Sequence, residues 1–162
     1  MSPAAALPTV LIGIGNVMRH DDGVGPAAVA MAAERFPAVQ PGVELDLLVL
    51  DGEPTRLVEA WRGRRLAIVV DAARSASPAG AIHRVEVGCD ALPSWTGRAS
   101  THSAGLAEAV ALARALDVLP GRLVVFGVEA GDLSLGEGLT PAVRAALAPL
   151  IDGVAAEARR WL

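Results

Sequence analysis

The feature that most constrains the fold of this chain is a repeated alternation of short apolar runs with segments of helical periodicity. The apolar runs are rich in β-branched residues, which is typical of buried strands, and they lie at residues 9–15, 43–52, 65–73 and 122–129. The segments with helical spacing lie at residues 24–36, 53–63, 102–116 and from 141 onwards. This alternation predicts an α/β protein, a three-layer sandwich in which helices cover both faces of a mostly parallel sheet.

Two further segments complete the expected fold. Residues 81–88 alternate imperfectly between apolar and polar side chains, which predicts an edge strand and brings the sheet to about five strands. Thr140 and Pro141 have the residue types preferred at the start of a helix, whereas Pro149 is expected to kink the last helix or split it in two. No linker, repeat or low-complexity tract interrupts the chain, so we expect residues 1–162 to form a single domain.

Composition excludes several classes of protein. The chain is 52% apolar, so it should fold around a core, and its net charge of −4, with no run of basic residues longer than a pair, argues against a nucleic-acid partner. No membrane-length apolar stretch occurs, and the segment MSPAAALP lacks the basic residues of a secretory signal. The single cysteine, Cys89, fits a reducing compartment and is expected to be inert. We therefore expect a cytoplasmic protein, and a monomer.

The segment GIGNVMRHDDGVGP, residues 13–26, begins like a dinucleotide-binding turn but departs from that pattern. Gly13 and Gly15 match the first two glycines of G-x-G-x-x-G, whereas Met18 occupies the third glycine position. Two carboxylates then follow, Asp21 and Asp22, where a phosphate site would avoid negative charge. The turn thus argues against a nucleotide-binding domain.

Polar side chains follow the carboxyl ends of the predicted strands. In open parallel sheets, functional groups collect at these ends. These residues are Asn16, Asp21, Asp22, Asp51, Asp71 and Glu129. Asp71 directly continues a fully apolar run, where a carboxylate needs a partner, a metal ion or a backbone N–H group. It is therefore either a ligand or a cap that bonds nearby amides of its own loop.

His102 is the histidine best placed for chemistry. Small hydroxyl residues precede it at the start of a predicted helix, where the helix dipole favours a neutral, metal-binding ring. An exposed loop histidine is the alternative, and His20 and His83 are weaker candidates. Asp22, Asp71 and His102 together would offer two oxygen ligands and one nitrogen ligand to a divalent metal ion, although their spacing matches no established metal motif.

The order of the motifs resembles that of the hydrogenase maturation proteases, the endopeptidases that trim the large subunit of [NiFe] hydrogenases. The resemblance rests on GIGNVMRHDDGVGP, LDGE, IVVDAARS, STHSAGL and VFGVEAGDLSLGEGLTPAV, and it runs from about residue 9 to about residue 150. It implies a twisted, mainly parallel sheet between helices, of the phosphorylase/hydrolase-like type. Some members of the family have Glu where this chain has Asp22, which retains the charge but shortens the reach of the ligand.

The resemblance also implies a reaction. The protein would be an aspartic-type endopeptidase that depends on nickel and cleaves a peptide bond during hydrogenase maturation. The substrate would be a nickel-loaded large-subunit precursor, from which a C-terminal extension is removed. The nickel, supplied by the substrate and replaceable by zinc or cadmium, would serve as the recognition signal. Asp22, Asp71 and His102 would be the metal-contacting and catalytic residues. We expect Asp51 to hold the substrate or orient a water molecule, and Asn16, grouped with it as a substrate-side residue, to tie down the turn through its backbone bonds.

Three alternatives remain at this point. The chain could bind metal-loaded precursors without cleaving them, because the same ligands would serve metal sensing. It could be a related peptidase of the same fold with another target, such as a spore-protein protease. It could also be a nucleotide-binding domain, which Met18 and the two aspartates disfavour.

Overall fold

The computed structural model describes residues 8–36, 45–88 and 101–159, with the side chains of residues 101–104 left out. Within these ranges, five strands form one sheet in the order β2-β1-β3-β5-β4, and β4 alone of these strands is antiparallel to its neighbour. The elements are β1 (Thr9–Ile14), the 3-10 turn η1 (His20–Gly23), α1 (Val24–Arg35), β2 (Leu45–Leu50), α2 (Pro54–Trp61), β3 (Leu66–Ala73), β4 (Ile82–Glu86), α3 (Thr101–Leu116), β5 (Arg122–Glu129) and α4 (Pro141–Arg159). The α/β prediction is confirmed.

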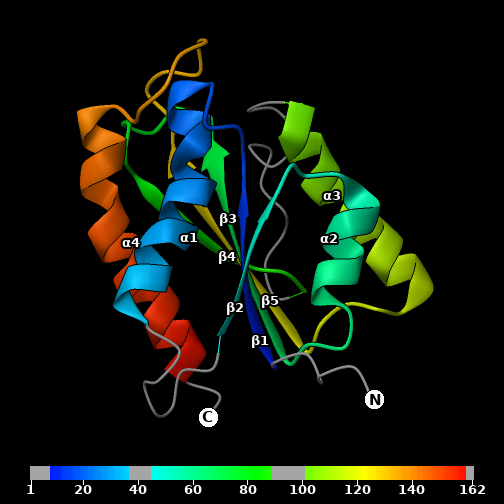
Figure 1. Cartoon of the computed structure of the whole chain (residues 1–162). Coiled ribbons are helices and arrows are strands. Elements are labelled where there is room, and N and C mark those ends of the chain that lie inside the picture. The colour runs from blue at the N-terminus through cyan, green and yellow to red at the C-terminus, as the bar shows by residue number, and fades with distance from the viewer. Residues whose placement is uncertain (1–7, 37–44, 89–100, 160–162) are drawn as a thin grey trace.

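The molecule has three layers, with α1 and α4 on one face of the sheet and α2 and α3 on the other (Figure 1). Alternate residues of the central strands face the two helical layers, as the period of a strand requires. In β3, Leu66, Ile68 and Val70 pack toward α1 and α4, whereas Ala67 and Val69 pack toward α2 and α3. Both faces of the central strands are therefore buried, which explains why these strands are apolar without alternation.

The predicted elements agree with the observed ones except within the last helix. The segment at 81–88 is the antiparallel edge strand β4, and α2 ends at Trp61, shortly before Gly63. The helix α4, however, runs without a break from Pro141 to Arg159, so of the two effects predicted for Pro149, a kink or a split, the split is wrong. Proline removes one internal hydrogen bond, but apolar residues on both sides of Pro149, Val143 and Leu147 before it and Leu150 and Ile151 after it, are buried and hold the helix in place.

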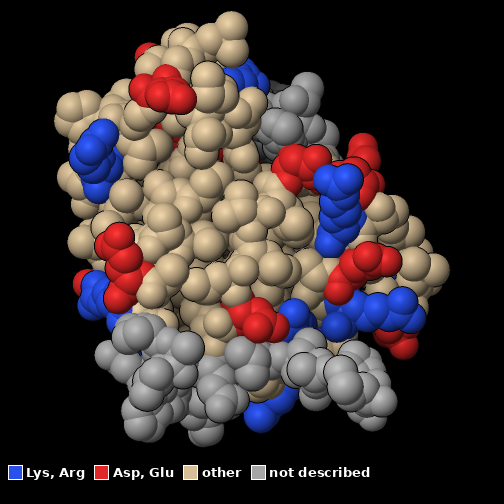
Figure 2. Space-filling view, in the orientation of Figure 1, with Lys and Arg blue, Asp and Glu red and all other residues tan. Residues whose placement is uncertain are grey.

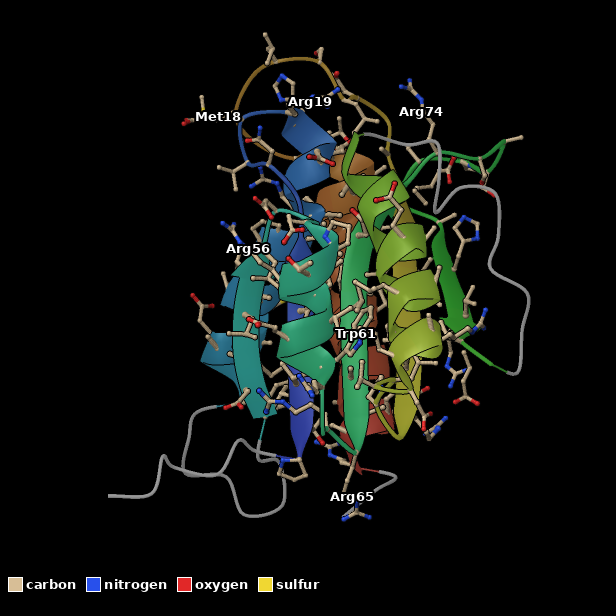
Figure 3. All side chains as sticks on the ribbon, turned by 90° about the vertical axis from the view of Figure 1, so that its right-hand side faces the viewer. Met18, Arg19, Arg56, Trp61, Arg65 and Arg74 are labelled. Carbon is tan, nitrogen blue, oxygen red and sulfur yellow. The ribbon has the colours of Figure 1, made fainter. Side chains whose placement is uncertain are left out.

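The parallel strands all end at one end of the molecule, which is the end where the predicted site residues should gather. Met18, Arg19 and Arg74 lie at this carboxyl end of the sheet, whereas Arg65, which precedes β3, lies at the opposite end (Figure 3). On the face shown in Figure 2, acidic and basic side chains are interspersed around a broad neutral area. Across the described ranges, no helix combines the length and apolar character needed to span a membrane.

Candidate functional site

The glycine turn after β1 folds back on itself and brings Asp22 against the end of the strand. Gly15 has φ of +148°, and a Cβ atom at this position would lie 1.8 Å from the carbonyl oxygen of Asp22. Only glycine permits this approach. Asn16 is exposed, and its side-chain oxygen accepts a hydrogen bond from the backbone N–H of Met18 (2.9 Å), which agrees with the expected role in tying down the turn.

Asp22 is fully buried in η1 and is incompletely hydrogen bonded. The backbone N–H of Asn16 donates to its Oδ2 atom at 2.9 Å. Its Oδ1 atom is buried and has no hydrogen-bond partner among the residues that the structure describes. A buried polar atom without a partner is costly in a folded protein, so such an atom indicates a missing partner. A cation brought to the site would supply that partner.

Asp71 lies in β3 near the carboxyl end of the strand and is 1% exposed. Burial is the main cause that raises the pKa of this carboxyl group well above its ordinary value, and the nearby charge of Asp22 raises it further. The backbone N–H of Ala72 donates to Oδ1 at 2.8 Å and acts in the opposite direction. The structure thus brings Asp22 and Asp71 together in a buried pair whose simultaneous ionisation is unfavourable without a cation.

Asp21 has a structural role that the sequence did not reveal. It is fully buried, and its Oδ2 atom accepts hydrogen bonds from the backbone N–H groups of Gly131 (2.8 Å) and Asp132 (2.9 Å). Its Oδ1 atom accepts from the backbone N–H of Thr140 (2.7 Å), whose hydroxyl lies 2.8 Å from Oδ2 and 3.1 Å from Oδ1. Asp21 therefore fixes the segment from 131 to 140 to the glycine turn, and only Asp22 of the acid pair keeps a free oxygen.

Asp51 follows β2 and begins the turn into α2. Its side chain is 57% exposed, its Oδ1 atom accepts from the backbone N–H of Glu53 (3.1 Å), and its Oδ2 atom pairs with Arg56 (3.2 Å). The two oxygens are thus engaged locally but lie in contact with solvent, where an exposed ion pair is weak. This geometry leaves Asp51 accessible to a substrate at the same end of the sheet.

Glu129, the last acid at the strand ends, is fully engaged. It is 2% exposed, and Ser75 donates to it through the backbone N–H (2.7 Å) and the hydroxyl (2.9 Å). His83 lies 3.3 Å from its Oε2 atom. This arrangement ties the loop after β3 to β5 and β4. It leaves Glu129 less free to act as a ligand than Asp22.

His102 is the second residue of α3, as expected for a histidine in the first turn of a helix. Its side chain lies outside the described residues, as does Cys89. Among the side chains that the structure describes, no group of three or more His, Cys, Asp or Glu is arranged to hold a metal ion. Of the three predicted ligands, the structure therefore describes the side chains of Asp22 and Asp71.

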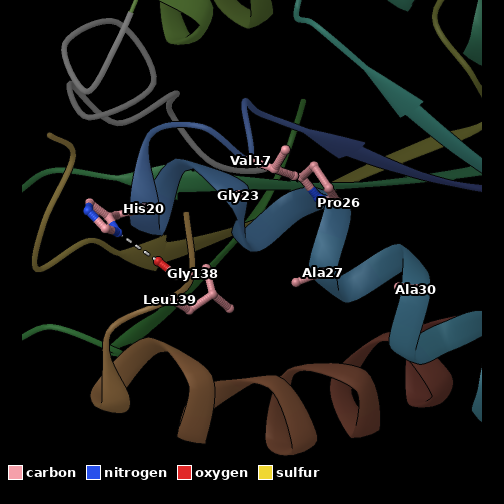
Figure 4. Close-up of a pocket in the computed structure, with 8 residues that line it drawn as sticks. All are labelled: Val17, His20, Gly23, Pro26, Ala27, Ala30, Gly138 and Leu139. Carbon is pink, nitrogen blue, oxygen red and sulfur yellow. Dashed lines mark hydrogen bonds between the residues drawn. The ribbon is translucent and has the colours of Figure 1, made fainter. Parts of the chain in front are cut away.

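An open hollow of about 310 Å³ lies beside the turn that carries Asp22 (Figure 4). Its walls are mostly apolar and include Val17, Pro26 and Leu139, and Gly23 lines it directly after Asp22 in sequence. The Nδ1 atom of His20 lies 3.0 Å from the carbonyl oxygen of Gly138, which closes one end of the wall. The glycine turn therefore shapes both the acid pair and an apolar surface.

Comparison with known proteins identifies the family of the chain. The family model described as hydrogenase maturation protease (HycI) matches residues 39–157. The hydrogenase expression/formation protein HupD of Thiocapsa roseopersicina is 33% identical over 151 residues, which cover 90% of this chain but only 65% of the relative. HupD of Bradyrhizobium diazoefficiens is 32% identical over 148 residues, which cover 88% of this chain and 73% of the relative.

A solved structure shows the same fold. The hydrogenase maturating endopeptidase HybD from Escherichia coli superposes with a TM-score of 0.80 at 25% sequence identity, and the match covers 95% of this chain and 93% of that protein. The family match spans most of the chain, and both the relatives and the superposed structure are named for a role in forming or maturing hydrogenases. The chain therefore belongs to the hydrogenase maturation protease family.

Proposed function

We propose that this protein cleaves the C-terminal extension from a nickel-loaded [NiFe]-hydrogenase large-subunit precursor and that it recognises the nickel held by that substrate. The observation that carries the proposal is the buried acid pair, in which Oδ1 of Asp22 has no partner and the pKa of Asp71 is raised. Such a pair gains a favourable counter-charge when a divalent cation enters. The membership of the chain in a maturation protease family supports peptide hydrolysis as the reaction.

In this proposal Asp22 and Asp71 supply oxygen ligands and His102 supplies a nitrogen ligand to the nickel of the substrate. A metal ion bound in this way polarises a carbonyl group or lowers the pKa of a bound water molecule. Water then adds to the scissile carbonyl carbon, the C–N bond breaks, and the leaving amine takes up a proton. Asp51, which is exposed at the same end of the sheet, holds the substrate tail or orients that water.

Other divalent ions are expected to occupy the same ligands. Oxygen and imidazole ligands do not discriminate strongly among the late divalent metals, so zinc and cadmium should substitute for nickel. The proposal places the reaction in the cytoplasm, with the protein acting as a monomer on the precursor. The single cysteine supports a reducing compartment, because it cannot form an internal disulfide.

Mass spectrometry of the precursor tests the proposal. Nickel-loaded and nickel-free precursor are incubated with the protein, and we expect the loss of a C-terminal peptide from the nickel-loaded form alone. The variants Asp22→Asn and His102→Ala should fold and leave the precursor intact. Asp132→Asn is the matched control, because this aspartate is on the neighbouring loop and its side chain accepts hydrogen bonds from Ser134; this variant should cleave normally.

Other outcomes would redirect the assignment. Cleavage of the nickel-free form would contradict the recognition of nickel. Tight binding of the nickel-loaded precursor without any change in its mass would favour a metal-sensing binding protein. The absence of both binding and cleavage with a cognate precursor would indicate a related peptidase with another target.

A further inference from the structure

The amino-terminal part of α3 lies directly against the turn that follows β2, and two glycines make the contact. A Cβ atom added at Gly105 would lie 1.9 Å from the carbonyl oxygen of Gly52 and 3.0 Å from its carbonyl carbon. Approaches this short essentially never occur for a real Cβ atom. With the backbone in this position, glycine alone fits at position 105.

Gly105 is unfavourable as a local choice, which indicates that the contact itself has a purpose. Glycine is among the poorest residues for the interior of a helix, because it loses the most backbone entropy on folding. The rest of α3 consists largely of good helix formers such as Ala and Leu. Glycine at position 105 therefore lowers the helix propensity of α3 but allows its backbone to approach Gly52 closely.

The contact joins two segments that belong to the candidate site. His102 precedes Gly105 by three residues in the first turns of the same helix, so the backbone of residue 102 moves with that of Gly105. Asp51 directly precedes Gly52 at the end of β2. β2 pairs in parallel with β1, the strand that leads into the turn carrying Asp22. The distance between α3 and Gly52 thus sets where residue 102 stands relative to the acid pair.

We propose that Gly105 is a positioning residue that acts through His102. By omitting a side chain, it lets the first turn of α3 settle against Gly52, and this fixes the backbone that presents the imidazole to the metal. Any larger residue moves that turn away, because the atom it meets is backbone and cannot rotate aside. Functional groups need to be held within about 0.5 Å of their productive positions, so a small displacement is enough. The inference rests on the proposed function.

The test compares Gly105→Ala with Gly153→Ala, a matched control in α4. A Cβ atom at Gly153 would lie 3.4 and 3.5 Å from two ring atoms of Phe126, which is ordinary contact. Both variants replace a helical glycine with alanine and gain the same helix propensity. They differ in that only the variant at position 105 meets a backbone oxygen.

The readouts are helical circular dichroism, titration with Co²⁺ followed by its visible spectrum, and cleavage of nickel-loaded precursor. We expect Gly105→Ala to keep its helical signal and to bind Co²⁺ about 10–100-fold more weakly, the usual cost of disturbing the residues that orient a metal ligand. Its cobalt spectrum should resemble that of His102→Ala. Cleavage should fall by a similar factor through kcat, and Gly153→Ala should match the wild type in each measurement.

The double variant Gly105→Ala, His102→Ala separates positioning from a general structural role. If Gly105 acts through His102, the double variant loses no more Co²⁺ affinity than His102→Ala alone, because interacting positions are not additive. Additive losses would overturn the inference, as would a Gly105→Ala protein that fails to fold or one that binds and cleaves like the wild type. A wild-type protein that neither binds Co²⁺ nor cleaves would refute the proposed function and this inference with it.

Discussion

Asp21 and Asp22 are consecutive and fully buried, yet their carboxylates have opposite hydrogen-bonding environments. The two oxygens of Asp21 accept bonds from Gly131, Asp132 and Thr140. Asp22 accepts one bond from Asn16, and within the described part of the chain its Oδ1 atom has no partner. The fold thus uses the first aspartate to close the turn on the segment from 131 to 140, whereas Oδ1 of the second one receives no hydrogen bond from the described residues.

This difference predicts that two neighbouring substitutions affect stability to very different extents. Asp21→Asn places an amide N–H₂ group among N–H donors and should lower the free energy of unfolding by about 2–5 kcal/mol, the cost of leaving buried donors unpaired. Asp22→Asn should change stability little, because Oδ1 loses no bond. Urea unfolding measures the difference, and an Asp22→Asn protein destabilised as strongly as Asp21→Asn would contradict it.

The raised pKa of Asp71 predicts that the metal-free protein becomes less stable as the pH rises. Above the ordinary aspartate value of 3.8 the unfolded chain loses this proton while the folded protein keeps it. The folded state then binds more protons than the unfolded state, so stability falls with rising pH until the raised pKa is passed. Asp71→Asn removes this dependence, and it should be more stable than the wild type at neutral pH.

Urea unfolding between about pH 4 and about pH 8, with a chelator present, checks this dependence. The gain from Asp71→Asn should shrink toward the acidic end of the range, because there the carboxyl group of the unfolded chain begins to keep its proton, as the folded one does. Asp22→Asn should weaken the dependence without abolishing it, because burial is the larger cause of the shift. Parallel wild-type and Asp71→Asn curves would mean that Asp71 is not perturbed.

Asp51 should affect the substrate more than the fold. Its side chain is largely exposed and its ion pair with Arg56 is on the surface, so Asp51→Asn should change the free energy of unfolding by about 0.5 kcal/mol or less. If Asp51 holds the substrate tail, KM for the precursor should rise while kcat changes little. Arg56→Gln, which breaks the same ion pair, is the control, and an equal rise in KM there would assign the effect to the pair.

Pro149 should lower the free energy of unfolding of the protein, although α4 remains continuous through it. It lies at an exposed position inside a continuous helix, where proline removes the hydrogen bond to the carbonyl of Ala145. Pro149→Ala should therefore raise the free energy of unfolding, by about 1–3 kcal/mol. Pro141→Ala is the control, because proline is favourable in the first helical position and this change should gain little. Chemical denaturation of the two variants would show the contrast.

Much of the fold could be predicted because its signals are local. The strands of the sheet centre are continuous apolar runs, and the helices between them have a helical apolar period, so their alternation alone indicates a parallel α/β sheet. The positions of Asp22 and Asp71 at the strand ends followed from the same rule, which brings the carboxyl ends of parallel strands together. The continuous course of α4 through Pro149 was not predictable, because it depends on what the flanking turns pack against.

The sequence by itself determined which elements form, which residues follow the strands, and the motifs that resemble a protease family. Only the tertiary structure decided how the two adjacent aspartates divide their roles, because the donors that saturate Asp21 come from residues more than a hundred positions away. The tertiary structure also decided that Gly105 must lack a side chain, because the carbonyl oxygen of Gly52, just after the end of β2, lies where a Cβ atom would be. Hydrogen-bond satisfaction and steric exclusion between distant segments exist only once the chain is packed.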